Sequence, residues 1–288
     1  MSFYNVVSAS DESTVITEYK PSAKRSDSYQ SEADLEREFI RLLGEQSYEY
    51  LNIKSEEDLI KNLRKKLEQL NNYEFTDGEW KRFFNECMAN PNEGIVEKTR
   101  KIQEDNVQNL KTDAGFTKNI TLIDKKNIHN NKLQVINQYE ATGNYDNRYD
   151  VTILVNGLPL VHIELKRRGV AIKEAFNQID RYQRDSFWAS CGLYEYVQIF
   201  VISNGTNTKY YSNTTRFNHI KDSASGQAKK KEKTSNSFEF TSFWADGNNR
   251  IIPDLVDFTK TFFAKHTLLA ILTKYCVFTS ENMLLVMR

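Results

Sequence analysis

The chain has 288 residues, of which 39% are hydrophobic and 12% aromatic, enough to bury one large core or one core with a small appendage. Its 39 basic and 39 acidic residues cancel, so any contact with nucleic acid must come from local basic patches. Three widely spaced cysteines and isolated histidines indicate neither a disulfide framework nor a zinc site. Without a signal peptide or an apolar run long enough to span a membrane, a reduced, cytoplasmic setting with no membrane contact is expected.

The N-terminal third begins with a polar stretch and continues with helical patterns. Residues 1–27 predict a polar extension that is at most partly ordered. Residues 31–45 predict a helix, capped by Ser31 or Asp34. Its apolar side would consist of Leu35, Phe39, Leu42 and Leu43. A second helix begins after Ser55, with Asp58 as the acid of a capping box. Its apolar stripe would be Leu59, Leu63, Leu67 and Leu70, and two more helical segments follow at 76–89 and 93–105.

Strand-like runs dominate the middle of the chain. They are rich in β-branched residues and are bounded by turn residues, and they occupy residues 121–126, 133–140, 150–155, 160–165 and 196–204. A helical pattern at 169–188 separates the last two runs. This order predicts an α/β fold with a mixed central β-sheet flanked by helices.

Residues 147–169 place three charged side chains in a pattern typical of metal-dependent nucleases. Asp150 begins one strand, and Glu164 and Lys166 end the next. Glu164 and Lys166 share a face because residues two apart on a strand project together, and the apolar residues between them face a core. Asp150 and Glu164 would suffice to hold Mg²⁺ at a DNA backbone, with Lys166 orienting or deprotonating a water. The alternative is an ordinary solvated strand end.

The register of this hairpin decides whether the site can form. A register of the wrong parity would aim Asp150 away from Glu164. A three-residue loop over 156–158, which contains an asparagine and a glycine able to take positive φ, would pair the two acids. We therefore predict an odd-length loop or a β-bulge in this hairpin.

The helical pattern at 169–188 carries a second polar pair. Gln178 and Tyr182 are four residues apart and would lie on one helix face, opposite or beside a repeat that includes Ala175 and Ile179. Either both side chains point at one ligand, or Tyr182 packs into the core and Gln178 is exposed.

The run RYDVTILVNGLPLVHIELKRRGVAIKEAFNQIDRY resembles the N-terminal nuclease domain of the R (restriction, motor) subunit of type I restriction-modification enzymes, of the PD-(D/E)xK superfamily. The similarity includes the glutamine-x-x-x-tyrosine motif after the lysine. It extends to DSYQSEADLEREFI, LIDKKNIHNNKLQVINQYE and VISNGTNTKYY, and so to residues 28–288. The resemblance implies a restriction-endonuclease-like fold, with Asp150, Glu164 and Lys166 catalytic and Gln178 and Tyr182 supporting cleavage.

Further residues and partners follow from the same resemblance. A glutamate on the first helix often joins such sites, and Glu32 is the best match, with Glu36 as its competitor. The cofactor would be Mg²⁺, and the partners would be double-stranded DNA and the methyltransferase (modification) and specificity subunits. Arg167 and Arg168 would contact DNA or form a solvated strand end. The lysine-rich run 229–233 is expected to lie in a mobile loop.

The domain organisation is expected to follow the resemblance. Residues 28–260 would be the endonuclease domain, and 261–288 would connect to an ATP-dependent translocase that the chain lacks, because no G-x-x-x-x-G-K-[ST] phosphate loop occurs. ATP would serve only that motor. The leading hypothesis is an endonuclease domain that cuts duplex DNA with Mg²⁺. The alternatives are a non-catalytic DNA-binding or docking module and a related repair or recombination nuclease.

Overall fold

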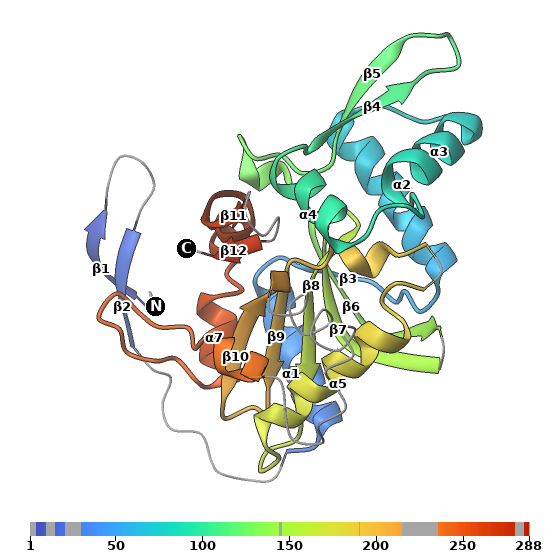
Figure 1. Cartoon of the computed structure of the whole chain (residues 1–288). Coiled ribbons are helices and arrows are strands. Elements are labelled where there is room, and N and C mark those ends of the chain that lie inside the picture. Colours follow the sequence, from blue (N-terminus) through green and yellow to red (C-terminus); the bar gives the residue numbers. More distant parts are fainter. Residues whose placement is uncertain are drawn as a thin grey trace.

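The central element of the chain is a six-stranded sheet with helices on both faces (Figure 1). A computed structural model describes residues 4–9, 15–20, 30–143, 146–189, 191–214, 236–279 and 285–287. Helix α1 (Glu32–Glu45) lies behind the sheet and α5 (Ile172–Asp185) in front of it in the view of Figure 1. The predicted α/β fold with a mixed central sheet flanked by helices is confirmed.

The sheet combines parallel and antiparallel pairs. Its strands in spatial order are β10 (Thr208–Ser212), β9 (Ile199–Ser203), β8 (Leu158–Leu165), β7 (Asp146–Val155), β6 (Leu133–Thr142) and β3 (Glu49–Tyr50). The pairs β8 with β9 and β3 with β6 are parallel, and the others are antiparallel. Helix α5 makes the crossover that a parallel β8–β9 pair requires. Helix α5 packs against β8 and β9. Because β7 and β8 are antiparallel, the beginning of β7 lies beside the end of β8.

The predicted N-terminal helices form, and their caps decide where they begin. Ser31 caps α1, since its hydroxyl accepts the N–H of Asp34 at 3.1 Å. Ser55 caps α2 (Glu56–Asn71) in the same way. The predicted capping box at Ser55 is incomplete. The Asp58 carboxylate accepts a hydrogen bond from the Ser55 hydroxyl at 2.7 Å rather than from the Ser55 backbone N–H. The predicted apolar residues of both helices are buried except Leu70, which is half-buried.

Residues 76–130 contain the largest departure from the predicted strands. Helix α3 (Asp77–Phe83), the π-turn η1 (Phe84–Met88) and α4 (Ile95–Gln103) lead to a hairpin of β4 (Val107–Lys111) and β5 (Thr117–Thr121). The predicted strand over 121–126 is wrong. Asp124 Oδ1 accepts the backbone N–H groups of Lys126 and Asn127, which turns the chain into η2 (Ile128–Asn130). A local side-chain acceptor thus competes with strand pairing.

The C-terminal segment packs on the same core. After β10 it contains η5 (Asn236–Phe240), α7 (Leu255–Thr261), α8 (Lys265–Ala270), η6 (Ile271–Tyr275), β11 (Cys276–Phe278) and β12 (Leu285–Met287), whereas η3 (Leu193–Tyr196) directly precedes β9. Helix α7 lies against α1, and Phe258, Phe262 and Phe263 are fully buried. In the described part of the chain, no helix is both long and apolar enough to cross a membrane. The lysine-rich run 229–233 lies outside the described residues.

The N-terminal region contains a strand pair of its own. Strands β1 (Tyr4–Ala9) and β2 (Val15–Tyr19) pair antiparallel, and they lie beside the six-stranded sheet rather than in it (Figure 1). The backbone N–H of Tyr19 reaches Asp246 Oδ2 at 3.4 Å, which ties β2 to the C-terminal half of the chain.

The β7–β8 hairpin uses a bulge to reach the required register. Asn156 and Gly157 form a two-residue turn with φ of +52° and +85°, and Val155 pairs with Leu158. The predicted three-residue loop is therefore wrong. The predicted bulge is confirmed, because the register shifts so that Leu160 has no partner on β7. Both residues of an Asn-Gly turn can take positive φ, which suits the twist of a hairpin. The bulge then shifts the pairing by one residue, so that Asp150 and Glu164 come to lie opposite each other.

Candidate metal-dependent active site

Asp150 and Glu164 meet where β7 and β8 run side by side. The ladder between the two strands ends at the pair of Val151 with Ile163, and one further step brings Asp150 opposite Glu164. Asp150 Oδ2 accepts the backbone N–H of Leu165 at 2.9 Å. Glu164 is fully buried on β8, which lies between β7 and β9 in the sheet. The bulge thus places two carboxyl groups together on neighbouring strands.

Lys166 follows directly after β8 and turns back to the same acid. Its Nζ lies 3.1 Å from Glu164 Oε1, and its backbone N–H donates to the carbonyl of Ser203 on β9 at 2.8 Å. Glu164 and Lys166 therefore share a face, as their spacing predicts. The lysine is held at the end of the strand with its ammonium group beside the buried carboxylate.

The two acids lie in an environment that disfavours their ionised forms. Burial, followed by the charge of Glu164, raises the pKa of Asp150 to about 8. Burial also raises the pKa of Glu164 to about 7, although the positive charge of Lys166 opposes this effect. Burial and, for Asp150, the neighbouring negative charge thus both favour the protonated form of this carboxyl pair. A divalent cation would reverse this preference by binding the ionised pair.

The donor set at this position fits a hard divalent cation. Apart from the Asp150 carboxyl, Glu164 Oε2 has no hydrogen-bond partner among the described residues. Either a proton or a cation between the two acids would satisfy this buried oxygen. Within the described residues, no three His, Cys, Asp or Glu side chains gather into a metal-binding cluster. Mg²⁺ commonly takes only one or two carboxylates and completes its shell with water and phosphate oxygens.

His162 lies closer to the site than its isolation in the sequence indicates. It is fully buried on β8, and its Nε2 is 3.8 Å from Glu164 Oε2. Its Nδ1 is 3.3 Å from the hydroxyl of Thr152. The ring packs edge-on against Tyr149 and Phe187. His162 thereby forms part of the apolar wall behind Glu164.

The two candidate glutamates on α1 have different surroundings. Glu32 Oε1 accepts the backbone N–H of Arg167 at 3.3 Å, and its charge contributes to the raised pKa of Glu164. Glu36 accepts hydrogen bonds from the amides of Asn137 and Gln138 on β6. Neither completes a cluster of three metal-ligating side chains among the described residues. Metal binding by Glu32 stays a prediction.

Gln178 and Tyr182 contact each other and the strand that carries Asp150. Gln178 Nε2 donates to the hydroxyl of Tyr182, which itself donates to the carbonyl of Arg148 at 2.9 Å. Tyr182 is buried, and its ring lies 4.9 Å from that of Tyr149. Tyr182 therefore packs into the core, as the second alternative predicted, but Gln178 is half-buried rather than exposed. A role of the two residues in cleavage stays a prediction. Burial and the charges of Glu164 and Asp150 raise the pKa of Tyr182, so its hydroxyl stays protonated as a donor.

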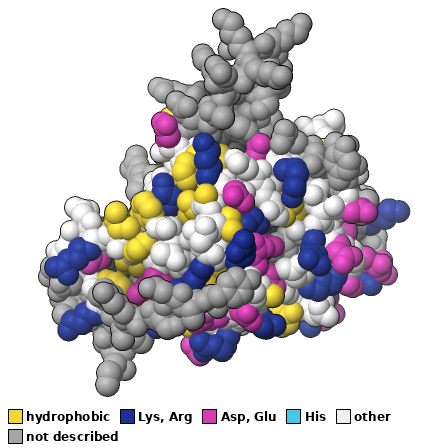
Figure 2. Space-filling model, turned by 90° about the horizontal axis from the view of Figure 1, so that it is seen from below, with side chains coloured by type: hydrophobic (Ala, Val, Ile, Leu, Met, Phe, Trp, Pro, Cys, Tyr) yellow, Lys and Arg dark blue, Asp and Glu magenta, His cyan; other side chains and the backbone are white. Residues whose placement is uncertain are grey.

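The two arginines after Lys166 differ in exposure. Arg167 is exposed, whereas Arg168 is half-buried against Gly205, and its Nε has no hydrogen-bond partner among the described residues. Figure 2 views the molecule from the end at which β8 finishes. Lys and Arg side chains are interspersed there with Asp and Glu rather than forming a patch of one sign. DNA contact by either arginine stays a prediction.

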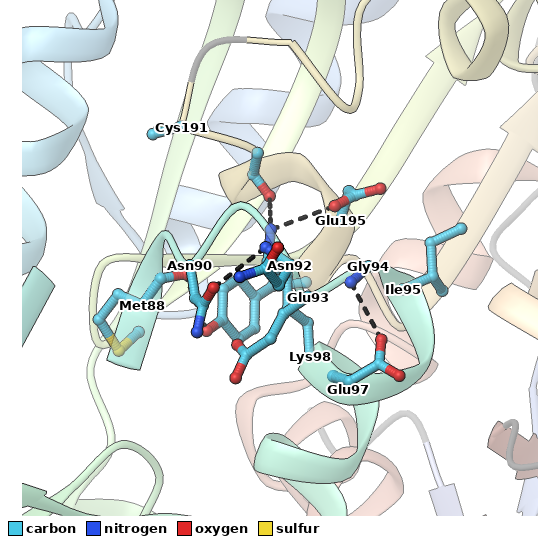
Figure 3. Close-up of polar contacts among 12 residues, drawn as sticks. Met88, Asn90, Asn92, Glu93, Gly94, Ile95, Glu97, Lys98, Cys191 and Glu195 are labelled. Atoms are coloured by element: carbon cyan, nitrogen blue, oxygen red, sulfur yellow. Dashed lines mark hydrogen bonds and ion pairs between the residues drawn. The ribbon is translucent and has the colours of Figure 1, made fainter. Parts of the chain in front are cut away.

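A second buried charged cluster, which the sequence did not reveal, joins α4 to the segment before β9 (Figure 3). Lys98 is 2% exposed, and its Nζ donates to the carbonyl of Gly192 at 2.9 Å and to Glu195 Oε2 at 3.1 Å. Gly192 has φ of +63°, and a side chain there would meet Lys98 Nζ at 2.7 Å. No sequence signal could reveal this cluster, because Lys98 and Glu195 lie 97 positions apart.

A protein-family model described as "Type I restriction enzyme R protein N terminus" matches residues 29–219, about two thirds of the chain. The chain belongs to this family. The match contains β7, β8 and α5, and with them every residue of the site described above. The resemblance identified from the sequence is thereby confirmed, and the chain is an N-terminal domain of the R subunit.

The chain is also similar to proteins that are named endonuclease subunits of type I restriction enzymes. The type I restriction enzyme EcoprrI endonuclease subunit of Escherichia coli is 51% identical over 283 residues, covering 98% of this chain and 85% of that protein. The SsaAORF53P endonuclease subunit of Staphylococcus saprophyticus is 36% identical over 90% of this chain, which corresponds to 26% of that protein. The putative MjaIXP endonuclease subunit of Methanocaldococcus jannaschii is 36% identical over 105 residues.

Proposed function

We propose that this R-subunit domain is a Mg²⁺-dependent endonuclease that hydrolyses phosphodiester bonds of duplex DNA, with a site of the PD-(D/E)xK type. One observation carries the proposal. Asp150 and Glu164 lie side by side on adjacent strands, largely removed from water, with the ammonium group of Lys166 at 3.1 Å from Glu164. Buried like charges are costly, so such a pair is typical of a site that binds a cation.

Each residue of the site has a role that its surroundings allow. Asp150 and Glu164 would hold Mg²⁺ through their carboxylate oxygens, and Glu164 Oε2 is the acceptor that lacks a partner outside the acid pair. The bound ion lowers the pKa of a water from about 15.7 toward neutrality and stabilises charge on the scissile phosphate. Lys166 would orient the attacking water by donating a hydrogen bond to it or, after losing its own proton, would take a proton from that water as a neutral amine. Gln178 and Tyr182 hold α5 against β7 and so keep the strand of Asp150 in place.

The remaining steps of the reaction would belong to other parts of the enzyme. The relatives are named endonuclease subunits of type I restriction enzymes, and two of them match this chain over very different shares of their length, 85% and 26%. In our proposal, cleavage follows ATP-driven translocation by a motor elsewhere in the R subunit. Specificity and methyltransferase subunits would recognise the DNA sequence. The enzyme would act in the cytoplasm. Arg167 and Arg168 would contact the DNA backbone.

The decisive test compares plasmid cleavage and ATP hydrolysis by the complete R subunit assembled with its partner subunits in Mg²⁺. We expect Lys166→Ala to abolish cleavage while ATP hydrolysis persists, because the lysine would serve the nuclease site and not the motor. Lys65→Ala, on the exposed side of α2, is the matched control and should leave both activities unchanged. Cleavage that survives in Lys166→Ala would refute the assigned site and favour a non-catalytic docking module.

A further inference from the structure

One residue inside the central sheet has a left-handed backbone. Gln138 in β6 has φ of +52°, and it lies directly opposite Asp150, because the residues on either side of it pair with those on either side of Asp150. The other non-glycine residues with positive φ in the described part of the chain lie outside helices and strands. A non-glycine residue keeps this strained conformation only where its surroundings impose it, and such strain is common at functional sites.

On β7, opposite Gln138, successive side chains do not alternate regularly between the two faces of the sheet. Thr152 Oγ1 lies 3.3 Å from the hydroxyl of Tyr194, and the ring of Tyr149 lies 4.6 Å from the ring of the same Tyr194. Residues three apart on a regular strand project to opposite faces, so the alternation is interrupted between Tyr149 and Thr152. Local irregularities of this kind re-aim a side chain. Here Asp150 turns its carboxylate to the backbone of β8.

Glu36 of α1 binds the side chains of the strained residue and of the residue before it. Its carboxylate accepts hydrogen bonds from the side-chain amide of Gln138 and, at 2.5 Å, from that of Asn137. Lys54 Nζ donates to the backbone carbonyl of Asn137, which fixes the strand just before the strained position. Glu36 is only 9% exposed, so water cannot readily replace the acceptor. Helix α1 is therefore hydrogen-bonded, through Glu36, to the part of β6 that lies opposite Asp150.

We propose that Glu36 is a positioning residue, which acts through Gln138 to hold the Asp150 carboxylate in the geometry that binds Mg²⁺. This inference rests on the proposed function, because it assigns a support behind a metal ligand. Partners that orient the ligands of a metal site typically change its affinity or activity by about 10- to 100-fold when they are lost.

The test is isothermal titration of the 288-residue chain with Mg²⁺ alone, together with thermal unfolding of every variant. We expect Glu36→Ala and Gln138→Ala to weaken Mg²⁺ binding about 10-fold or more. Glu36→Gln keeps one acceptor for an amide donor and should retain an intermediate affinity. Glu45→Ala, on the same helix but exposed, is the charge-matched control and should bind as the wild type does.

A second control separates positioning from stability alone. Asn72→Ala replaces the left-handed residue that ends α2 and should lower the melting temperature without changing the Mg²⁺ affinity. Wild-type affinity in both Glu36→Ala and Gln138→Ala, with binding still lost in Asp150→Asn, would overturn the inference and leave the proposed function standing. Equal losses in Glu36→Gln and Glu36→Ala would make Glu36 a direct ligand and also overturn it. Binding that ignores Asp150 would overturn both proposals.

Discussion

The chain buries charged side chains in two places, and the two places treat them in opposite ways. Lys98 is paired with Glu195 and a backbone carbonyl, so the buried cation has neutralising and hydrogen-bonding partners. The pair of Asp150 and Glu164 brings together two groups of the same sign, and Glu164 Oε2 has no hydrogen-bond partner among the described residues apart from the Asp150 carboxyl. We expect the first cluster to stabilise the fold, and in our proposal the second sacrifices stability for a position at which a cation can bind.

The largest expected effect concerns cleavage at the acid pair. Glu164→Gln removes a ligand charge from the site, so DNA cleavage by the assembled enzyme should fall by about 10³-fold or more, as when a principal electrostatic group of an active site is lost. The measurement is the rate of plasmid cleavage. The isosteric change Glu195→Gln in the second cluster is the matched control, and cleavage that decreased equally in both variants would remove the distinction between the two clusters.

The second effect concerns the stability of the paired cluster. Lys98→Met leaves the Glu195 carboxylate, which is 14% exposed, without its cation, and should lower the free energy of unfolding by roughly 3 kcal/mol. Urea denaturation measures this change. Lys98→Met combined with Glu195→Leu should recover much of the loss. Arg41→Ala, which breaks an exposed pair on α1, should change the free energy by about 0–1 kcal/mol. A negligible loss in Lys98→Met would show that the cluster does not stabilise the fold.

The third effect is the response of stability to Mg²⁺. Because a cation would bind the folded site and not the unfolded chain, Mg²⁺ at 100 times its dissociation constant should stabilise the wild type by about 2.7 kcal/mol. Asp150→Asn should show no such gain, and Lys98→Met should keep it despite its lower starting stability. Differential scanning calorimetry with and without chelator provides the measurement. An equal response in Asp150→Asn would place the cation elsewhere.

The smallest effect is a pH dependence without divalent cations. The folded-state pKa of Asp150 is about 8, above its ordinary value of 3.8, so the folded protein binds more protons than the unfolded chain between these values. The contribution of this group to stability should therefore be complete below pH 3.8 and should be lost progressively as the pH rises toward 8. Asp150→Asn should flatten this decline in urea denaturation measured in chelator. If Asp150→Asn left the dependence of stability on pH unchanged, folding would not disfavour the ionised Asp150 carboxylate.

Local patterns predicted much of the fold and the central part of the site. The capping serines and leucine stripes located α1 and α2, and the apolar runs located β6, β7 and β8. The two-residue period of a strand was enough to place Glu164 and Lys166 together. The strand predicted over 121–126 was wrong because Asp124 offers its own acceptor to the backbone, a local competition that a hydrophobic pattern does not express.

The sequence by itself determined the types of most elements, the need for an odd-length loop or a bulge in the hairpin, and the choice of Asp150, Glu164 and Lys166 as candidate site residues. These depend on patterns among near neighbours in the chain. Only the tertiary structure decided that an Asn-Gly turn and a bulge satisfy that parity, and that Glu36 reaches Gln138 across 102 positions. It alone also paired Lys98 with Glu195. Such contacts depend on how helices pack against the sheet, and a single sequence carries no local signal of which distant side chains will meet.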